Sequence, residues 1–240
     1  MEMINRILTK LFGALTNIVD YPNKQKILKF FKNKLKNDYL KVIDIGAHKG
    51  ETINFFLNNF KIDEIYAFEP NLDLYNQLKK SNKFNSKKIK IFNLGVGIKD
   101  ETKTLNIMTD TSSSTINSID QESEYFKRKK RILSLFSPSK NFIKKQQEIK
   151  IINLSKIISQ NNIDRIDILK IDTEGYEYNV IRGLELIDFK KIKYIYLEHH
   201  YDLMIKKEYK FSDIDFLLNK NNFFKKYKLK MIFRKSFEYI

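Results

Sequence analysis

Apolar positions change their period repeatedly along this chain, from short β-branched runs to segments with an apolar residue every three or four positions. The runs indicate buried strands and the spaced segments indicate amphipathic helices. Strands are predicted over 41–45, 64–68, 88–93, 103–108, 115–119, 148–153, 166–171 and 193–200, and helices over 51–59, 72–81, 154–161, 176–184 and 211–220. This alternation predicts an α/β fold with a doubly wound, mostly parallel sheet. Two closing strands, 224–229 and 231–235, would add an antiparallel C-terminal edge strand.

Apolar residues also recur at helical spacing before the sheet region, over 3–19 and again over 24–36. We therefore divide the chain into N-terminal amphipathic helices over 1–38 and a domain over 39–240. The helices either pack on the sheet or form a segment that lies on a lipid surface. Packing predicts a cytoplasmic protein, whereas exposure predicts peripheral association with the inner membrane surface. No apolar run reaches the ~18–20 residues of a membrane-spanning helix.

The stretch Val42–Gly50 combines a buried strand, a glycine turn and the start of a helix. Gly46 allows a sharp turn and the close approach of a ligand, and Gly50 allows tight packing where the helix begins. A strand, a glycine turn and a helix N-terminus together form a cradle for a nucleotide. The spacing differs from Gly-x-Gly-x-x-Gly, which indicates a ligand without a pyrophosphate group.

The next two strands end in residues that fit the same ligand. Glu69 lies roughly 20 positions after Gly46, the separation expected of the acid that binds ribose hydroxyls, and Pro70 then ends the strand. Gly95 and Val96 follow the third strand, where we expect them to approach a base. Three such strand ends on one sheet edge predict a nucleoside-binding site, because ligands of these sheets bind at the carboxyl ends of the strands.

Four polar residues mark the ends of two later strands and form the candidate reacting site. Asp172 and Glu174 follow strand 166–171, and Glu198 and His200 end the following strand. A carboxylate beside an imidazole suits a general base. We favour this interpretation over a divalent-metal site, which the same four side chains could form. A capping role for Glu174 and an ion pair between Lys170 and Asp172 are the structural alternatives.

Together these motifs resemble the FkbM family of S-adenosylmethionine-dependent methyltransferases over roughly residues 39–201, through stretches 42–50, 67–70, 170–177 and 198–200. The resemblance implies a Rossmann-like class I methyltransferase fold. It also implies S-adenosylmethionine as cofactor, S-adenosylhomocysteine as product, and methylation of hydroxyl oxygens on sugars, polysaccharides, glycolipids and some polyketides. We assign cofactor binding to Asp44, Gly46, Ala47, His48, Gly50, Glu69, Pro70, Gly95 and Val96, and catalysis to Asp172, Glu174, Glu198 and His200.

The sequence departs from the family at two places. His48 stands where many relatives have asparagine, so it either contacts the cofactor or only fills the turn. Residues 121–148 form an insertion that is longer and more basic than is usual, with a basic run over 127–131. Such a segment is either a helical insertion or a lid, because long unstructured loops are uncommon in compact domains.

Charge and composition bring in two alternatives. The 240 residues carry a net charge of +16, which suggests an RNA ribose 2′-O-methyltransferase. However, only six residues are arginine, the side chain that nucleic-acid sites favour, so we expect no specific nucleic-acid partner. The absence of cysteine excludes disulfides, thiolate metal sites and a cysteine nucleophile. A non-catalytic module that binds glycan or membrane is the other alternative.

Overall fold

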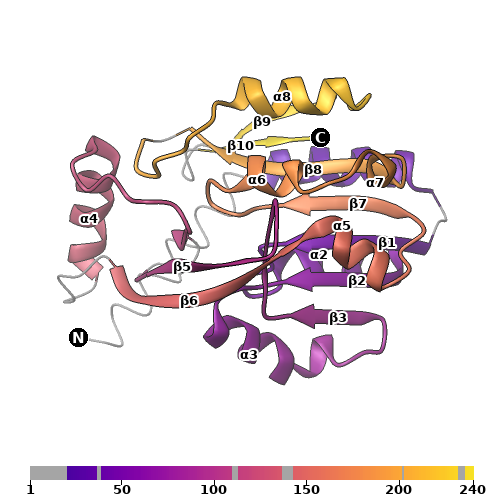
Figure 1. The fold of residues 1–240 in the computed structure, drawn as a ribbon, viewed down its shortest axis with the longest axis horizontal. Coiled ribbons are helices and arrows are strands. Elements are labelled where there is room, and N and C mark those ends of the chain that lie inside the picture. The colour runs from indigo at the N-terminus through magenta and orange to yellow at the C-terminus, as the bar shows by residue number, and fades with distance from the viewer. Residues whose placement is uncertain (1–20, 37–38, 110–112, 137–142, 202, 232–235) are drawn as a thin grey trace.

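The computed structural model describes residues 21–36, 39–109, 113–136, 143–201, 203–231 and 236–240. A seven-stranded sheet forms its centre, in the order β3-β2-β1-β7-β8-β10-β9 (Figure 1). These strands are β1 (Tyr39–Ile45), β2 (Lys61–Phe68), β3 (Ile89–Phe92), β7 (Ile166–Ile171), β8 (Ile192–His200), β9 (Lys228–Met231) and β10 (Ser236–Tyr239). The first five in spatial order are parallel, and β10 is antiparallel to both of its neighbours. The predicted fold class is confirmed.

Helices cover both faces of this sheet (Figure 1). They are α2 (Glu51–Asn59), α3 (Leu72–Lys80), α5 (Leu154–Gln160), α6 (Glu177–Arg182), α7 (Leu186–Phe189), α8 (Phe211–Lys220), a 3₁₀ turn (Asn82–Phe84) and an N-terminal helix over residues 21–34. Because side chains of a strand alternate between faces, β1 supplies two cores. Ile43 and Ile45 pack with residues of α5 and α6, whereas Leu40 and Val42 pack with residues of α2 and the N-terminal helix.

The N-terminal helix packs on the sheet. Phe31 is fully buried, and the Phe30 ring lies 5.4 Å from the Tyr194 ring of β8 and 5.3 Å from the Tyr227 ring. Of the two predicted N-terminal helices, this one therefore contributes to the core. The helix predicted over 3–19 lies outside the described residues. Within the described ranges, no helix has both the length and the apolar character needed to cross a membrane.

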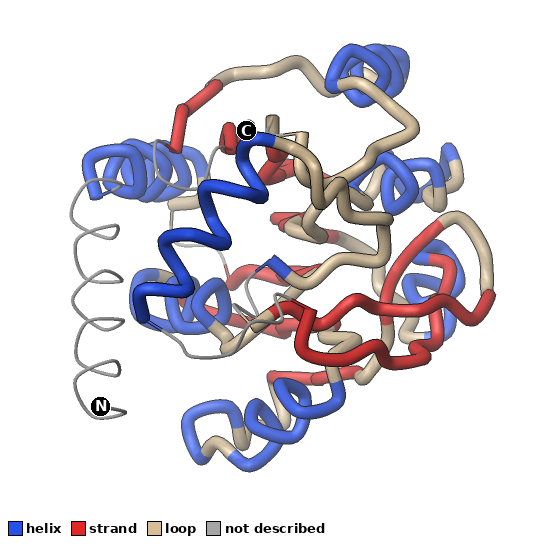
Figure 2. The backbone as a smooth tube through the Cα atoms, turned by 90° about the vertical axis from the view of Figure 1, so that its left-hand side faces the viewer, coloured by secondary structure: helices blue, strands red, loops and turns tan. Residues whose placement is uncertain are grey.

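A second sheet of three strands extends from the carboxyl ends of the central strands, and Figure 2 views the molecule from this side. It contains β4 (Gly95–Gly97), β5 (Glu101–Met108) and β6 (Ile143–Asn153), and α4 (Glu124–Phe136) lies beyond it. The predicted insertion 121–148 thus comprises α4 and the first half of β6. Phe126 anchors α4, because its side chain is 4% exposed and packs with Met108, Met204 and Ile205.

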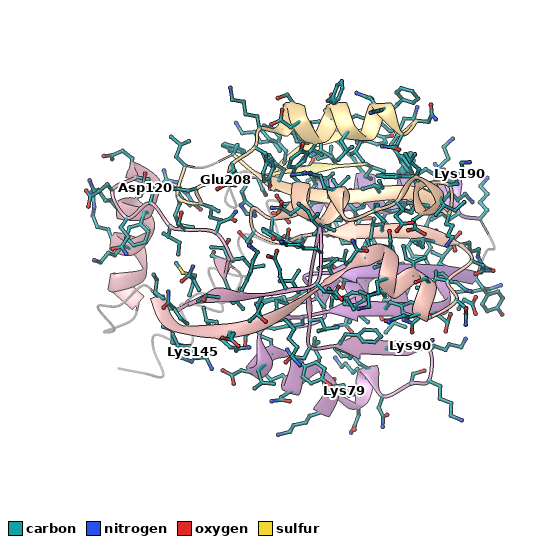
Figure 3. All side chains as sticks on the ribbon, in the orientation of Figure 1. Lys79, Lys90, Asp120, Lys145, Lys190 and Glu208 are labelled. Carbon is teal, nitrogen blue, oxygen red and sulfur yellow. The ribbon has the colours of Figure 1, made fainter. Side chains whose placement is uncertain are left out.

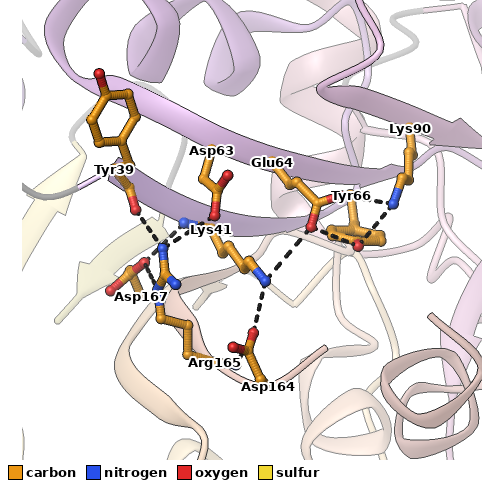
Figure 4. Close-up of polar contacts among 9 residues, drawn as sticks. All are labelled: Tyr39, Lys41, Asp63, Glu64, Tyr66, Lys90, Asp164, Arg165 and Asp167. Carbon is orange, nitrogen blue, oxygen red and sulfur yellow. Dashed lines mark hydrogen bonds and ion pairs between the residues drawn. The ribbon is translucent and has the colours of Figure 1, made fainter. Parts of the chain in front are cut away.

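At the amino ends of the strands, opposite charges alternate between neighbouring strands (Figure 4). Lys41 Nζ lies 2.7 Å from Asp164 Oδ1 and 3.7 Å from Glu64 Oε2. Arg165 Nη2 lies 3.2 Å from Asp63 Oδ2. These pairs are partly exposed, so water screens them and each contributes little to stability. They connect the neighbouring strands at this edge through ion pairs.

Two predicted strand assignments are wrong. Residues 115–119 form only isolated bridges, from Thr115 to Asn106 and from Ile119 to Ile205. The predicted strand 224–229 is displaced, because β9 covers 228–231. Most of the predicted strand 231–235 lies outside the described residues, and β10 at 236–239 lies between β8 and β9, so β9 is the edge. The hydrophobic pattern does not predict the last strand because two of its buried side chains are polar: Ser236 is 0% and Glu238 3% exposed.

Candidate functional site

The glycine turn brings the ends of β1 and β7 into backbone contact. Gly46 has φ of +89°, and a Cβ atom there would lie 1.8 Å from the carbonyl oxygen of Asp172. Gly50 has φ of +85°, and its Cβ atom would lie 2.5 Å from Cζ of Phe84. Positive φ favours glycine, and neither position has room for a side chain. The structure therefore explains both glycines by local geometry.

Asp44 is a fully buried carboxylate at the end of β1. Within the part of the chain that the structure describes, neither of its oxygens has a hydrogen-bonding partner. Its neighbour in β7 is Lys170, which is also buried. Burial raises the pKa of Asp44 to about 7, although the positive charge of Lys170 opposes this shift. A buried carboxylate without donors is unfavourable, so this position suits a ligand that brings positive charge or donors.

Glu69 ties the turn after β1 to the turn after β2. Its Oε2 accepts a hydrogen bond from the His48 backbone N–H at 2.7 Å, and its Oε1 accepts one from the Asn71 N–H at 2.8 Å. Burial raises the pKa of Glu69 to about 7 in spite of these bonds. Each carboxylate oxygen keeps a further lone pair, so ribose hydroxyls can still donate to it.

The residues around Glu69 have structural partners of their own. The His48 ring Nδ1 lies 3.2 Å from Glu51 Oε1, so its side chain contacts the start of α2. The Pro70 carbonyl oxygen accepts hydrogen bonds from Asn93 Nδ2 at 3.0 Å and from Gln147 Nε2 at 3.1 Å. Sequence reasoning missed Gln147 because it comes from β6, 77 positions away, and no local pattern connects it to Pro70.

Gly95, Val96 and Ala47 do not offer open side-chain positions. Val96 is 2% exposed and belongs to the central core, and Gly95 pairs with Ile151, whose Cδ1 lies 2.5 Å from a Cβ built on the glycine. Val96 is buried because β4 pairs with β6 in the second sheet, and the assignment of Gly95 and Val96 to cofactor binding stays a prediction. Ala47 is also 2% exposed.

The four residues assigned to catalysis do come together. His200 Nε2 lies 3.2 Å from Glu174 Oε2 and 3.6 Å from Glu198 Oε1. Lys170 Nζ lies 3.6 Å from Asp172 Oδ2. The side chains of Asp172 and Glu174 are 27% and 17% exposed, whereas those of His200 and Glu198 are 9% and 3% exposed. The cluster therefore runs from the surface into the interior.

Negative charge dominates this cluster. Burial, with the neighbouring charge of Glu198, raises the pKa of Asp172 well above its usual range, although Lys170 opposes the shift. Burial alone would lower the pKa of Lys170. The surrounding carboxylates, of which Asp172 has the largest effect, raise this pKa and keep the amine protonated. One ligand atom each from Asp172, Glu174 and His200 lie within 4.8 Å of one another, a separation that a divalent cation could bridge.

Two polar networks hold the turn that carries Asp172 and Glu174. Thr115 Oγ1 donates to the Glu174 carbonyl oxygen at 2.7 Å, and Asn117 Nδ2 donates to that of Gly175 at 2.6 Å. The buried Glu177 accepts from the Gly175 N–H through Oε1 at 2.8 Å. Burial would raise the pKa of Glu177, but its hydrogen bonds lower it to about 2, and the one with His199 has the largest effect among them. The turn is thus fixed from both sides.

Comparison with known proteins supports a family assignment. The family model described as Methyltransferase FkbM domain matches residues 44–225, which is more than half of the chain. A search of curated proteins finds no match. Among solved structures, the fold is similar to methyltransferase FkbM from Methylobacillus flagellatus KT, with 13% identity and a TM-score of 0.50 over 84% of this chain. This chain spans 43% of that one.

A second similar structure is described as a putative RNA methyltransferase from Pyrococcus horikoshii. It shows 14% identity and a TM-score of 0.41, and the alignment covers 95% of this chain and 80% of that one. A likeness of that size carries no functional argument. The assignment follows instead from the family model, which includes Asp44, Glu69 and the turn at 172–175. This chain belongs to the FkbM methyltransferase family.

Proposed function

We propose that this protein is an S-adenosylmethionine-dependent O-methyltransferase that methylates a hydroxyl group of a sugar, polysaccharide or glycolipid. One observation carries the proposal: the glycine turn and the carboxylate–histidine cluster meet at one edge of the sheet, where Gly46 contacts the backbone of Asp172. Ligands of doubly wound sheets bind at this edge. Methyl transfer to an alcohol needs a donor site beside a group that accepts a proton, because the reaction depends on alignment and deprotonation.

The residues of the first half of the site fit S-adenosylmethionine. This cofactor carries positive charge, and Asp44 offers a buried carboxylate that has no donor among the described residues. Gly46 and Gly50 keep the turn free of side chains, and Glu69 retains lone pairs for ribose hydroxyls. When bound, the cofactor supplies an electrophilic methyl group on its sulfonium. Asp44, Gly46 and Glu69 would hold it.

The second half of the site can remove the proton of the acceptor hydroxyl. Glu174 and His200 form a pair at 3.2 Å, and Glu174 is its more exposed member. The pair therefore places a carboxylate and an imidazole together where they can accept a proton. Lys170 and Asp172, which lie beside the pair, would orient the acceptor hydroxyl.

We expect affinity for S-adenosylmethionine to increase with pH. Burial raises the pKa of Asp44 and of Glu69 to about 7, so each carboxyl is mostly protonated at pH 6 and mostly ionised at pH 8. A cationic ligand favours the ionised form, so each coupled group weakens binding about tenfold at pH 6 relative to pH 8. Calorimetric titrations at both pH values measure this ratio. An affinity that falls toward pH 8 would contradict the assignment of both residues.

A methyl-transfer assay tests the acceptor class. Radiolabelled S-adenosylmethionine is incubated with the protein and, in parallel, with polysaccharide, glycolipid and total RNA fractions. We expect label in the glycan-containing fractions. Label confined to RNA would replace the proposal with ribose 2′-O-methylation, and binding without label in any fraction would favour a non-catalytic module.

The four lysines labelled in Figure 3 do not form one basic stripe. Lys79, Lys90, Lys145 and Lys190 project from different sides of the molecule (Figure 3). They belong to α3, β3, β6 and the segment after α7, so these charges do not gather in one stripe. A nucleic-acid site normally concentrates basic residues on one face. A hydroxyl-bearing glycan needs no such concentration.

A further inference from the structure

The C-terminal strand β10 contributes two buried polar residues to the neighbourhood of the site. Ser236 is 0% exposed, and its Oγ donates a hydrogen bond to Glu198 Oε1 at 2.5 Å. Glu238 is 3% exposed, and its Oε2 accepts one from the Tyr196 hydroxyl at 2.6 Å. Both residues lie beyond residue 225, where the family match ends. The family assignment therefore gives neither residue a role.

The position of Glu198 depends on this strand. In the antiparallel pairing of β10 with β8, Ser236 is opposite His200 and Glu238 is opposite Glu198. Glu198 Oε1, which accepts from Ser236, is also the oxygen that lies 3.6 Å from His200 Nε2. A hydroxyl that donates to one carboxylate oxygen fixes the rotamer of that carboxylate and stabilises its charged form.

We propose that Ser236 is a positioning residue for the proposed methyl transfer: it holds the Glu198 carboxylate beside His200 Nε2, the ring atom that also faces Glu174, and so fixes the orientation of the imidazole. The same ring atom, His200 Nε2, lies 3.6 Å from Glu198 Oε1 and 3.2 Å from Glu174 Oε2, so the carboxylate that Ser236 holds is next to the nitrogen that faces Glu174. Ser236 touches no reacting atom itself. Its effect passes through Glu198, as an outer residue acts through the group that it orients.

The test compares Ser236→Ala with Ser236→Thr, which keeps the hydroxyl. Ser155→Ala is the matched control, because Ser155 is also a buried serine that bonds to backbone, at Gly183 and Glu185, away from the site. The chain has three histidines, so the ring nitrogen signals of ¹⁵N-histidine-labelled protein can be assigned with single variants. We expect the His200 signals at pH 8 to move in Ser236→Ala, to return in Ser236→Thr, and to stay in place in Ser155→Ala.

The kinetic readout rests on the proposed function, whereas the spectroscopic one does not. In the methyl-transfer assay, Ser236→Ala should lower kcat about tenfold with the affinity for S-adenosylmethionine unchanged, and Ser236→Thr should restore most of kcat. Unmoved His200 signals in Ser236→Ala would overturn the inference even if the enzyme methylates glycans. Moved signals in a protein that transfers no methyl group would support the contact and refute the proposed function. A parallel loss of cofactor affinity would indicate a merely structural role.

Discussion

His200→Ala should lower the turnover number by about 10²–10⁴-fold while leaving the affinity for S-adenosylmethionine nearly unchanged. His200 Nε2 lies 3.2 Å from Glu174 Oε2 and 3.6 Å from Glu198 Oε1, in the part of the site that we assign to the acceptor. Removing the imidazole breaks the Glu174–His200 pair, so the pair that would accept the proton of the hydroxyl group is lost. Asp44 and Glu69, which we assign to the cofactor, make none of these contacts. Steady-state kinetics and calorimetry on the same preparation measure both quantities.

Treatment of the wild type with a chelator separates a base from a metal ligand. If the cluster acts as a base, wild-type activity should survive dialysis against EDTA. Activity that disappears with EDTA and returns with Mg²⁺ or Mn²⁺ would instead identify Asp172, Glu174 and His200 as ligands of a cation. An unchanged turnover number in His200→Ala would refute both roles. Loss of cofactor binding would show that His200 belongs to the donor half of the site.

Gly46→Ala should produce the largest loss of stability among single substitutions at this edge. The new Cβ atom would lie 1.8 Å from the carbonyl oxygen of Asp172, and the backbone φ of +89° is strained for alanine. Because the obstacle is backbone, relief requires the turns after β1 and β7 to separate. We expect a fall in the free energy of unfolding of about 3 kcal/mol or more, with loss of cofactor binding. Urea denaturation measures the first and calorimetry the second.

Gly95→Ala is the control for that experiment. Its Cβ atom would lie 2.5 Å from Cδ1 of Ile151, the far end of a flexible side chain that can rotate away, and its φ is not positive. We expect a loss of stability near 1 kcal/mol or less. If Gly46→Ala proves as stable as Gly95→Ala, the turn is not the rigid junction that the structure indicates.

Local patterns predicted the elements that position the site. The bounds predicted for α2, β7 and α8 coincide with the observed ones, because each is a continuous apolar or amphipathic run bounded by clear turns. The meeting of the strand ends also followed from the sequence, since parallel strands present their carboxyl ends at one edge. The pattern therefore predicted that the carboxyl edge of the sheet carries Gly46, Glu69, Asp172 and His200.

Long-range polar contacts account for what the sequence did not predict. Ser236 and Glu238 are buried through bonds to Glu198 and Tyr196, so their strand carries no apolar signature. Thr115 and Asn117 hold the turn at Glu174 from a segment that only forms isolated bridges. The spacing of apolar residues predicts which apolar groups are buried, but it does not predict polar contacts between residues far apart in the sequence.

The central claim is that the edge formed by Gly46, Asp44 and Glu69 binds S-adenosylmethionine, and a calorimetric titration of the full chain at pH 8 tests it most directly. Asp44→Asn, which keeps the shape of the side chain and removes its charge, is the matched variant. We predict saturable one-to-one binding by the wild type and binding weakened about tenfold or more in Asp44→Asn, because a buried charge partner is lost. No binding by a folded wild type, or equal binding by the two proteins, would contradict the account.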